Sequence, residues 1–214
     1  MATLIEEIQL MCINNDTDIV SLLRKSYLAA NKLQIIDFAT WIRNELNGYP
    51  DKSLVPEYRV LTGNVKYFNR FHGWIPVYFE NAEMEDIFGT YYSCESIPQI
   101  LDYIKQDKEE VSFSYNSVAT DLFLKQGIMG QVNLKISTSS FINLVEHVKT
   151  AILDWTIILE KTGIKGDGIS FSDEEVKIAK SKDEIICFIE KNVASGSEIR
   201  ELYVSEREED GLNT

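Results

Sequence analysis

A regular stripe of apolar residues in the last third of the chain constrains the fold most. Its members recur at intervals of four, three, four, three and four residues, the spacing of one face of an α-helix. They are Phe141, Val145, Val148, Ile152, Trp155 and Leu159. The spacing predicts one long helix that ends near Gly163, and the preceding "STSS" offers N-cap side chains. A helix with so long an apolar face must be covered by other elements, so the chain needs a packed core around it.

The N-terminal fifth of the chain repeats the helical spacing three times. Apolar positions predict helices over residues 4–12, 22–33 and 35–46, separated by polar breaks. Asp16 or Thr17 is the predicted N-cap of the second helix. Gly48 stands where a left-handed residue ends a helix, and Pro50 prevents the third helix from continuing.

The middle of the chain changes to the composition of strands. "EYRVLTGNVKYF" and "GWIPVYFE" are rich in β-branched and aromatic residues and predict two or three antiparallel strands, the first beginning near Glu57. "SIPQILDYIKQ", with Ser96 as its cap, and "SVATDLFLKQG" predict helices, whereas "VSFSY" and "GQVNLKIS" read as extended. The predicted fold class is α+β and mainly helical, with N-terminal helices and one long late helix around a small antiparallel sheet.

Charge and composition narrow the class of protein. The 214 residues carry a formal charge of −13, which argues against a sequence-independent nucleic-acid binder, because phosphates require a basic face. No apolar run reaches the roughly 20 residues that a membrane span requires, and Glu6 and Glu7 stand where a signal peptide would be basic. Three cysteines lie far apart and make an odd number, which argues against a disulfide framework. We therefore expect a cytoplasmic protein that does not bind membranes.

Motifs for metal and nucleotide chemistry are weak. His72 and His147 have no companion ligand at zinc-site spacing. "GIKGDG" follows a helix instead of a strand and does not have the glycine order of a dinucleotide loop. "ENAEMED" contains four carboxylates but not the spacing of a calcium loop, so a solvated acidic turn is the favoured interpretation. The sequence predicts no metal and no cofactor.

One short stretch concentrates polar and aromatic side chains at a helix end. "WIRNELNGYP" is followed by "EYR", and these segments supply every candidate site residue: Trp41, Arg43, Glu45, Asn47, Gly48, Tyr49, Glu57, Tyr58 and Arg59. One interpretation is a polar functional site at a helix–strand junction. The other, which the residue types favour, is a junction in which Asn47 and Gly48 cap the helix and charge-assisted pairs stabilise the fold.

The same stretch carries a family resemblance. "LLRKSYLAANKL", "WIRNELNGYPD", "VPEYR" and "VKTAILDWTIILEKTGI" together resemble the AbiTii domain, a bacterial module named as a presumed abortive-infection toxin. The resemblance implies an AbiTii-like α+β domain over residues 1–165. After it, the residue pattern predicts a helical extension over 166–195 and a strand-like segment with an acidic tail over 196–214. The resemblance also implies restriction of phage, but it assigns no reaction and no catalytic residue.

Three functional hypotheses remain open at the level of sequence. The favoured one is a non-enzymatic module that senses a phage component or assembles with copies of itself or a partner defence protein, through β-augmentation by the segment from Ile199 to Val204. The second is a toxin enzyme that acts on a nucleotide, nucleic acid or protein, with Arg43, Glu45, Glu57 and Arg59 in its site. In the third, the junction only stabilises the fold.

Overall fold

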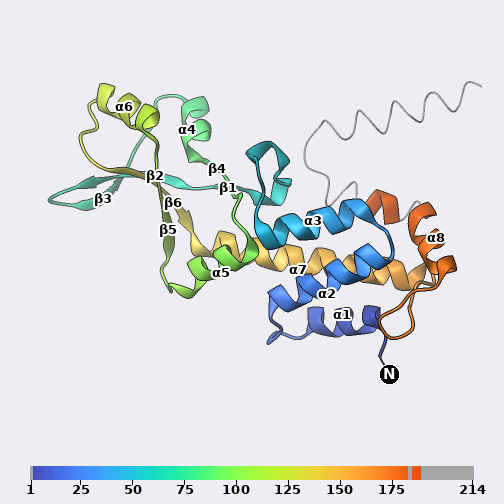
Figure 1. Ribbon diagram of the computed structural model, residues 1–214. Coiled ribbons are helices and arrows are strands. Elements are labelled where there is room, and N and C mark those ends of the chain that lie inside the picture. The colour runs from blue at the N-terminus through green and yellow to red at the C-terminus, as the bar shows by residue number, and fades with distance from the viewer. Residues whose placement is uncertain (1, 183–184, 189–214) are drawn as a thin grey trace, which may run out of the picture. The chain divides into compact units, whose positions relative to one another are not determined.

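The chain is mainly helical with a small antiparallel sheet, as the sequence predicts (Figure 1). The computed structural model describes residues 2–182 and 185–188. Contacts divide the chain into two compact units. The first comprises residues 1–57, 94–99 and 145–214, and the second comprises residues 58–93 and 100–144. The segment from Ile199 to Val204, predicted to mediate assembly, lies outside the described residues.

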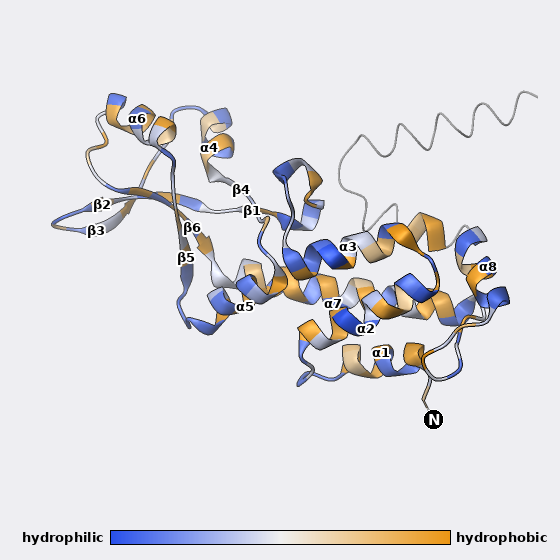
Figure 2. Ribbon diagram, viewed as in Figure 1, coloured by the Kyte–Doolittle hydropathy of each residue, from blue (hydrophilic) through white to orange (hydrophobic). Residues whose placement is uncertain are grey.

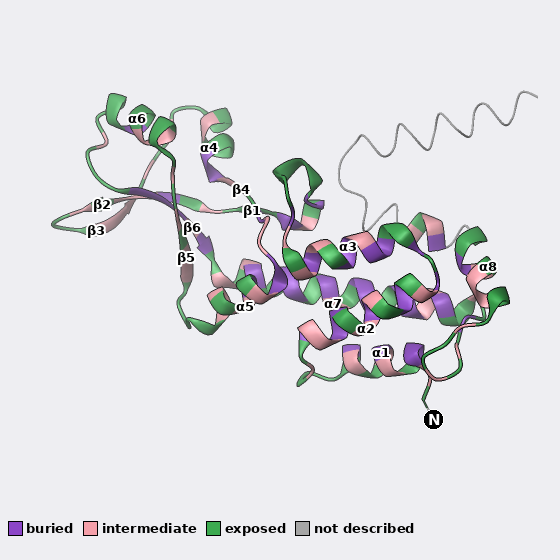
Figure 3. Ribbon diagram, viewed as in Figure 1, coloured by how far each residue is buried: buried purple, intermediate pink, exposed green. Residues whose placement is uncertain are grey.

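The first unit is built from amphipathic helices. Figures 2 and 3 show that apolar and buried positions alternate with hydrophilic and exposed ones along these helices. Phe38 and Trp155 stack at the centre with ring centroids 4.2 Å apart, and both side chains are fully buried. Lys25 and Glu7 form an ion pair of 2.7 Å between the first two helices. The elements assigned to this unit are α1 (Leu4–Ile13), α2 (Ile19–Lys32), α3 (Ile36–Asn47), the 3-10 turn η1 (Lys52–Leu54) and α8 (Asp173–Ser181).

The start of α2 corrects one sequence prediction. Its N-cap is Asp18, not Asp16 or Thr17, and the Asp18 carboxylate accepts from the backbone N–H groups of Val20 and Ser21. A hydrogen bond from the Ser21 hydroxyl, together with these N–H groups, lowers the pKa of Asp18. The helix can therefore start at Ile19, because its first N–H groups are already satisfied.

The long late helix, α7 (Thr138–Lys161), is confirmed and extends beyond its apolar stripe. Thr138, Ser139 and Ser140 lie inside the helix, but Ser137 precedes it and its hydroxyl accepts from the N–H of Ser139 at 3.4 Å, so the cap prediction for "STSS" holds only for its first residue. The preceding strand ends at Ser137, and helical backbone begins at the next residue. The part of α7 from Val145 onward belongs to the first unit and the part before it to the second.

The second unit contains a four-stranded antiparallel sheet in the order β3-β2-β6-β5 and a two-stranded ribbon of β1 and β4. The sheet has one apolar face, on which Val132, Leu134 and Ile136 of β6 are buried. This alternation is typical of a strand that covers a core on one side only. The strands are β1 (Val60–Thr62), β2 (Asn64–Asn69), β3 (Gly73–Pro76), β4 (Thr90–Tyr92), β5 (Glu110–Ser114) and β6 (Val132–Ser137).

Short helices connect these strands: α4 (Ala82–Gly89), α5 (Ile97–Lys105) and α6 (Ser117–Lys125). The acidic segment predicted as a solvated turn is instead α4, because Asn81 caps it by accepting from the N–H of Glu83 at 2.8 Å. Within the described residues, no His, Cys, Asp and Glu side chains gather as a group of three or more that could hold a metal ion. None of the described helices is long and apolar enough to cross a membrane.

Candidate functional site

The predicted site begins where α3 ends. Asn47 is the last residue of α3, and its side-chain amide donates to the carbonyl of Arg43 at 2.9 Å. Gly48 follows with φ +92° and ψ 160°. The positive φ agrees with the prediction, but this ψ lies outside the left-handed helical region. A Cβ at this position would lie 2.9 Å from the carbonyl oxygen of Cys94, so the turn requires glycine for space as well as for its backbone angle.

The chain leaving Gly48 is held by backbone and side-chain bonds. The N–H of Tyr49 donates to the carbonyl of Cys94 at 2.8 Å, and its hydroxyl donates back to Glu45 Oε1 at 2.7 Å. Tyr49 and Glu45 are both buried, and Glu45 has no exposed surface. Trp41, one turn before Glu45, is also buried and packs on Phe38 with ring centroids 5.0 Å apart. The helix end is therefore anchored from within.

The second part of the signature has a different local structure from the one predicted. Residues Glu57–Arg59 form a single 3-10 turn, η2, and the strand begins only at Val60. Tyr58 is half-buried and Glu57 is exposed, whereas Arg59 is fully buried. Arg59 Nη1 donates to the carbonyl of Ser93 at 2.9 Å, and the N–H of Ser93 donates to the carbonyl of Arg59 at 2.9 Å. Arg59 thus ties β1 to the end of β4 in the second unit.

Burial separates the four predicted charged site residues into two kinds. Arg43 and Glu57 are exposed, while Glu45 and Arg59 are inaccessible to solvent. Partial burial lowers the pKa of His147 on α7, and the carboxylate of Glu45 acts in the opposite direction. The signature therefore does not supply one open cluster of acids and bases, and its buried carboxylate and guanidinium are in contact with neighbouring protein groups.

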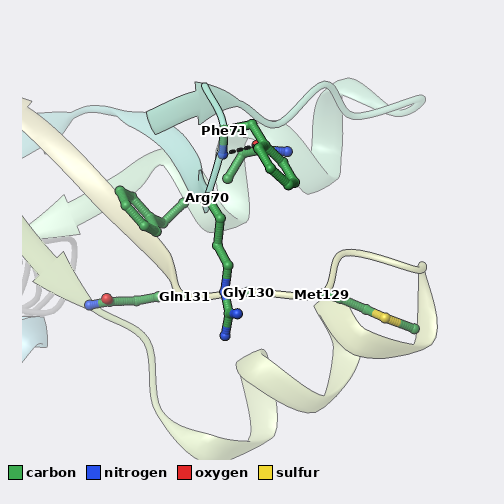
Figure 4. Close-up of a pocket in the computed structure, with 7 residues that line it drawn as sticks. Arg70, Phe71, Met129, Gly130 and Gln131 are labelled. Atoms are coloured by element: carbon green, nitrogen blue, oxygen red, sulfur yellow. Dashed lines mark hydrogen bonds between the residues drawn. The ribbon is translucent and has the colours of Figure 1, made fainter. Parts of the chain in front are cut away.

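A different feature, a surface hollow in the second unit, escaped the sequence interpretation. Its cavity volume is about 590 Å³, and Figure 4 shows Arg70 extending from the β2–β3 hairpin toward the segment around Gly130. Phe71 and Met129 are 91% and 85% exposed, and Arg70 is the one charged residue in the lining. The complete lining is Phe68, Asn69, Arg70, Phe71, Met129, Gly130 and Gln131.

Local hydrogen bonds shape this hollow. The Asn69 side-chain oxygen accepts from the N–H groups of Phe71 and His72, at 2.8 and 3.2 Å, which fixes the hairpin turn and projects Phe71 outward. Gly130 allows the opposite segment to approach, because a Cβ there would lie 2.8 Å from the carbonyl oxygen of Phe68. The turn signal at Asn69 was visible in the sequence. The partner segment, about sixty residues away, had no local signal.

The fold is that of a mainly helical α+β protein, in which Glu45 and Arg59 of the signature are buried and Arg43, Asn47 and Glu57 are exposed. The AbiTii family profile matches residues 3–184, which include both parts of the signature. The chain belongs to the AbiTii family, and the family name places it among abortive-infection, anti-phage defence proteins. Searches of curated proteins and of solved structures each gave no match.

Proposed function

We propose that this protein acts in abortive infection as a non-enzymatic module, which binds a phage component and assembles with copies of itself or with a partner defence protein. Family membership supports the defence role. The observation that supports a binding role over a catalytic one is the placement of the signature. Its carboxylate and guanidinium are buried, and each makes hydrogen bonds within its own unit.

The alternative is an effector enzyme that uses Arg43, Glu45, Glu57 and Arg59 on a nucleotide, nucleic acid or protein. General acid–base catalysis requires a side chain within hydrogen-bond reach of the substrate. Glu45 and Arg59 have no exposed surface from which to reach one. Arg43 and Glu57 are exposed, but neither lines the hollow around Arg70.

The sheet of the second unit offers a route to assembly. Its terminal strands, β3 and β5, each pair with a neighbour on one side only within the sheet. An unpaired strand edge is the surface to which an extended segment adds by β-augmentation. The segment from Ile199 to Val204 has the apolar, strand-like composition that suits this addition to a neighbouring copy.

A pair of C-terminal deletions tests this proposal. Deleting residues 196–214 removes the strand-like segment and the acidic end, whereas deleting residues 208–214 removes only part of the acidic end. We expect the longer deletion to reduce the number of copies in the oligomer and to abolish protection of bacteria against phage. The shorter deletion should preserve both the oligomer and the protection. Light scattering measures the mass and plaque counts measure protection. An oligomer that is unchanged by the longer deletion would contradict the proposed role of the C-terminal segment in assembly.

A further inference from the structure

The four-stranded sheet has a second face that is polar and aromatic. Side chains alternate between the two faces along a strand. The residues next to the buried Val65 and Leu134 in each strand therefore lie on this second face. We define the sheet platform as Lys66, Phe68, Trp74, Asn133 and Lys135. Register places Phe68 directly opposite Trp74 and Lys66 directly opposite Asn133, so the five come from three adjacent strands.

Two aromatic rings form the centre of the platform. Phe68 is 44% exposed, and its ring centroid lies 5.5 Å from that of Trp74 in an edge-on arrangement. Nζ of Lys135 lies 4.0 Å from the centroid of the Trp74 ring, a cation–π distance that also proves the two side chains share one face. Phe68 also lines the hollow described above, so the platform continues into it and reaches Arg70 and Phe71.

Cations predominate on this surface. Burial is the main cause that lowers the pKa of Lys135; the carboxylate of Glu110 raises it, and Lys66 and Lys108 lower it further. Glu110 also forms the ion pair with Lys66, at 2.7 and 2.9 Å. Among the described residues, neither Lys135 nor Arg70 takes part in a salt bridge, so both charges are available to an anionic partner.

The floor of the platform has an unused hydrogen-bond acceptor. Asn133 is 4% exposed, and its amide nitrogen donates to the Ser112 hydroxyl at 2.6 Å. Its Oδ1 has no hydrogen-bond partner among the described residues. A buried acceptor without a partner is costly to the fold.

Rings and cations on one open sheet face match a partner that carries planar groups and anions in alternation. Single-stranded nucleic acid has this pattern, since its bases can stack on aromatic side chains while its phosphates contact lysine and arginine. A duplex keeps its bases stacked inside. An acidic peptide supplies charge but no regular series of planar groups. The local excess of cations is also the reverse of the −13 carried by the whole chain.

We infer that the sheet platform, continued by the hollow around Arg70, binds single-stranded nucleic acid. In the sensing role proposed above, single-stranded nucleic acid is then the ligand. The biological purpose of this binding rests on the proposed function, whereas the binding itself does not. The aromatic pair stacks on bases, and Arg70 and Lys135 contact phosphates. Lys66 is partly neutralised by Glu110 and contributes less.

Binding of the full chain to fluorescein-labelled oligonucleotides of about twelve nucleotides tests the inference. Fluorescence anisotropy gives the affinity. Single-stranded DNA and single-stranded RNA are measured separately, which identifies the preferred nucleic acid. We expect Phe68→Ala and Trp74→Leu each to weaken binding about tenfold, the effect of one lost stacking contact. Trp74→Leu retains an apolar side chain, and the melting temperature of each variant verifies folding.

Salt dependence separates the charged contacts from the stacked ones. We expect the double variant Arg70→Gln, Lys135→Gln to reduce the slope of log affinity against log salt by about 1.4, or about 0.7 for each lost phosphate contact. Arg24→Gln is the matched control, because Arg24 is an exposed arginine on α2 in the first unit. Its slope should equal that of the unmodified protein.

Three results would overturn the inference. These are no binding of either strand at low salt, equal binding of a duplex, and binding of poly-glutamate with the same dependence on Phe68 and Trp74. The last result would assign the platform to an acidic protein instead. Because the assay uses purified protein and no phage, its failure leaves the proposed assembly and defence roles to be judged by the C-terminal deletions.

Discussion

At the scale of single residues, several carboxylates hold local structure by accepting hydrogen bonds from nearby backbone N–H groups. Glu175 is the clearest case. Its Oε1 accepts from the N–H groups of Lys165 and Gly166 at 2.9 and 2.7 Å, and its Oε2 accepts from the N–H and hydroxyl of Ser172 at 2.8 and 3.0 Å. Ser172 and Glu175 thereby form a capping box at the start of α8, and the same carboxylate also holds the loop before this helix.

Replacing Glu175 should loosen this loop measurably. We expect Glu175→Ala to lower the free energy of unfolding by about 1 kcal/mol, the usual loss for a helix cap. Glu174→Ala is the control, because Glu174 is an exposed neighbour in the same first turn. Urea denaturation at neutral pH measures both. A Glu175 variant as stable as the control would contradict the role assigned to the carboxylate.

The pH dependence of stability gives the same residue a second test. Burial raises the pKa of Glu175, but the N–H and hydroxyl donors outweigh it and lower the pKa below its usual 4.5. A carboxyl group whose pKa is lower in the folded state stabilises the protein above its unfolded pKa and loses that contribution as the pH falls. The difference in stability between the unmodified protein and Glu175→Ala should therefore shrink below about pH 4.5. A constant difference would contradict this assignment.

At the scale of elements, the turn after α3 is the most demanding local structure in the signature. Gly48→Ala introduces a Cβ at φ +92° and 2.9 Å from a backbone oxygen, so the backbone must shift. Gly163→Ala is a matched control, because Gly163 has φ +90° and nothing within 4 Å of the added atom. We expect the control to lose roughly 1–2 kcal/mol from its positive φ.

The Gly48 variant should lose more than this control, by roughly 1 kcal/mol or greater, because it adds a steric clash to the same backbone penalty. Thermal unfolding of both variants measures the difference. Equal losses of stability would show that the segment around Cys94 moves aside without measurable cost. The short distance between a Cβ at position 48 and the Cys94 carbonyl oxygen would then not affect stability.

The sequence predicted elements well where their signals are local. α7 was identifiable because its apolar residues recur every three or four positions. Predictions failed at boundaries, where the N-cap of α2 moved to Asp18 and η2 replaced the start of a strand. The hollow could not be predicted, because Arg70 and Met129 come together only through the pairing of β2 with β6.

At the scale of the whole molecule, charge is unevenly divided between the two units. The second unit contains seven Lys and Arg residues against nine Asp and Glu residues, whereas the first contains fourteen against twenty-five. The whole-chain charge argued against nucleic-acid binding. The relevant quantity is the local field, which depends on strand pairing that brings Lys66 and Lys135 onto one sheet face.

Burial separates the predicted signature from the surfaces described above. Its buried members Trp41, Glu45, Tyr49 and Arg59 make internal contacts, and the open features of the described chain, the hollow and the sheet platform, lie elsewhere. We therefore propose that the signature stabilises the fold of this chain, and we expect recognition to take place on surfaces outside it.

Paired measurement of phage protection and melting temperature in Glu45→Gln and Arg59→Lys tests this central claim most directly. Each substitution disturbs a buried charged hydrogen bond, at a cost of about 2 kcal/mol, or roughly 4–8 °C in melting temperature. If the signature is structural, protection should fall only as far as stability does, and should return at a lower growth temperature. Loss of protection by variants that melt at the unmodified temperature would contradict the account and favour a catalytic or binding site at the signature.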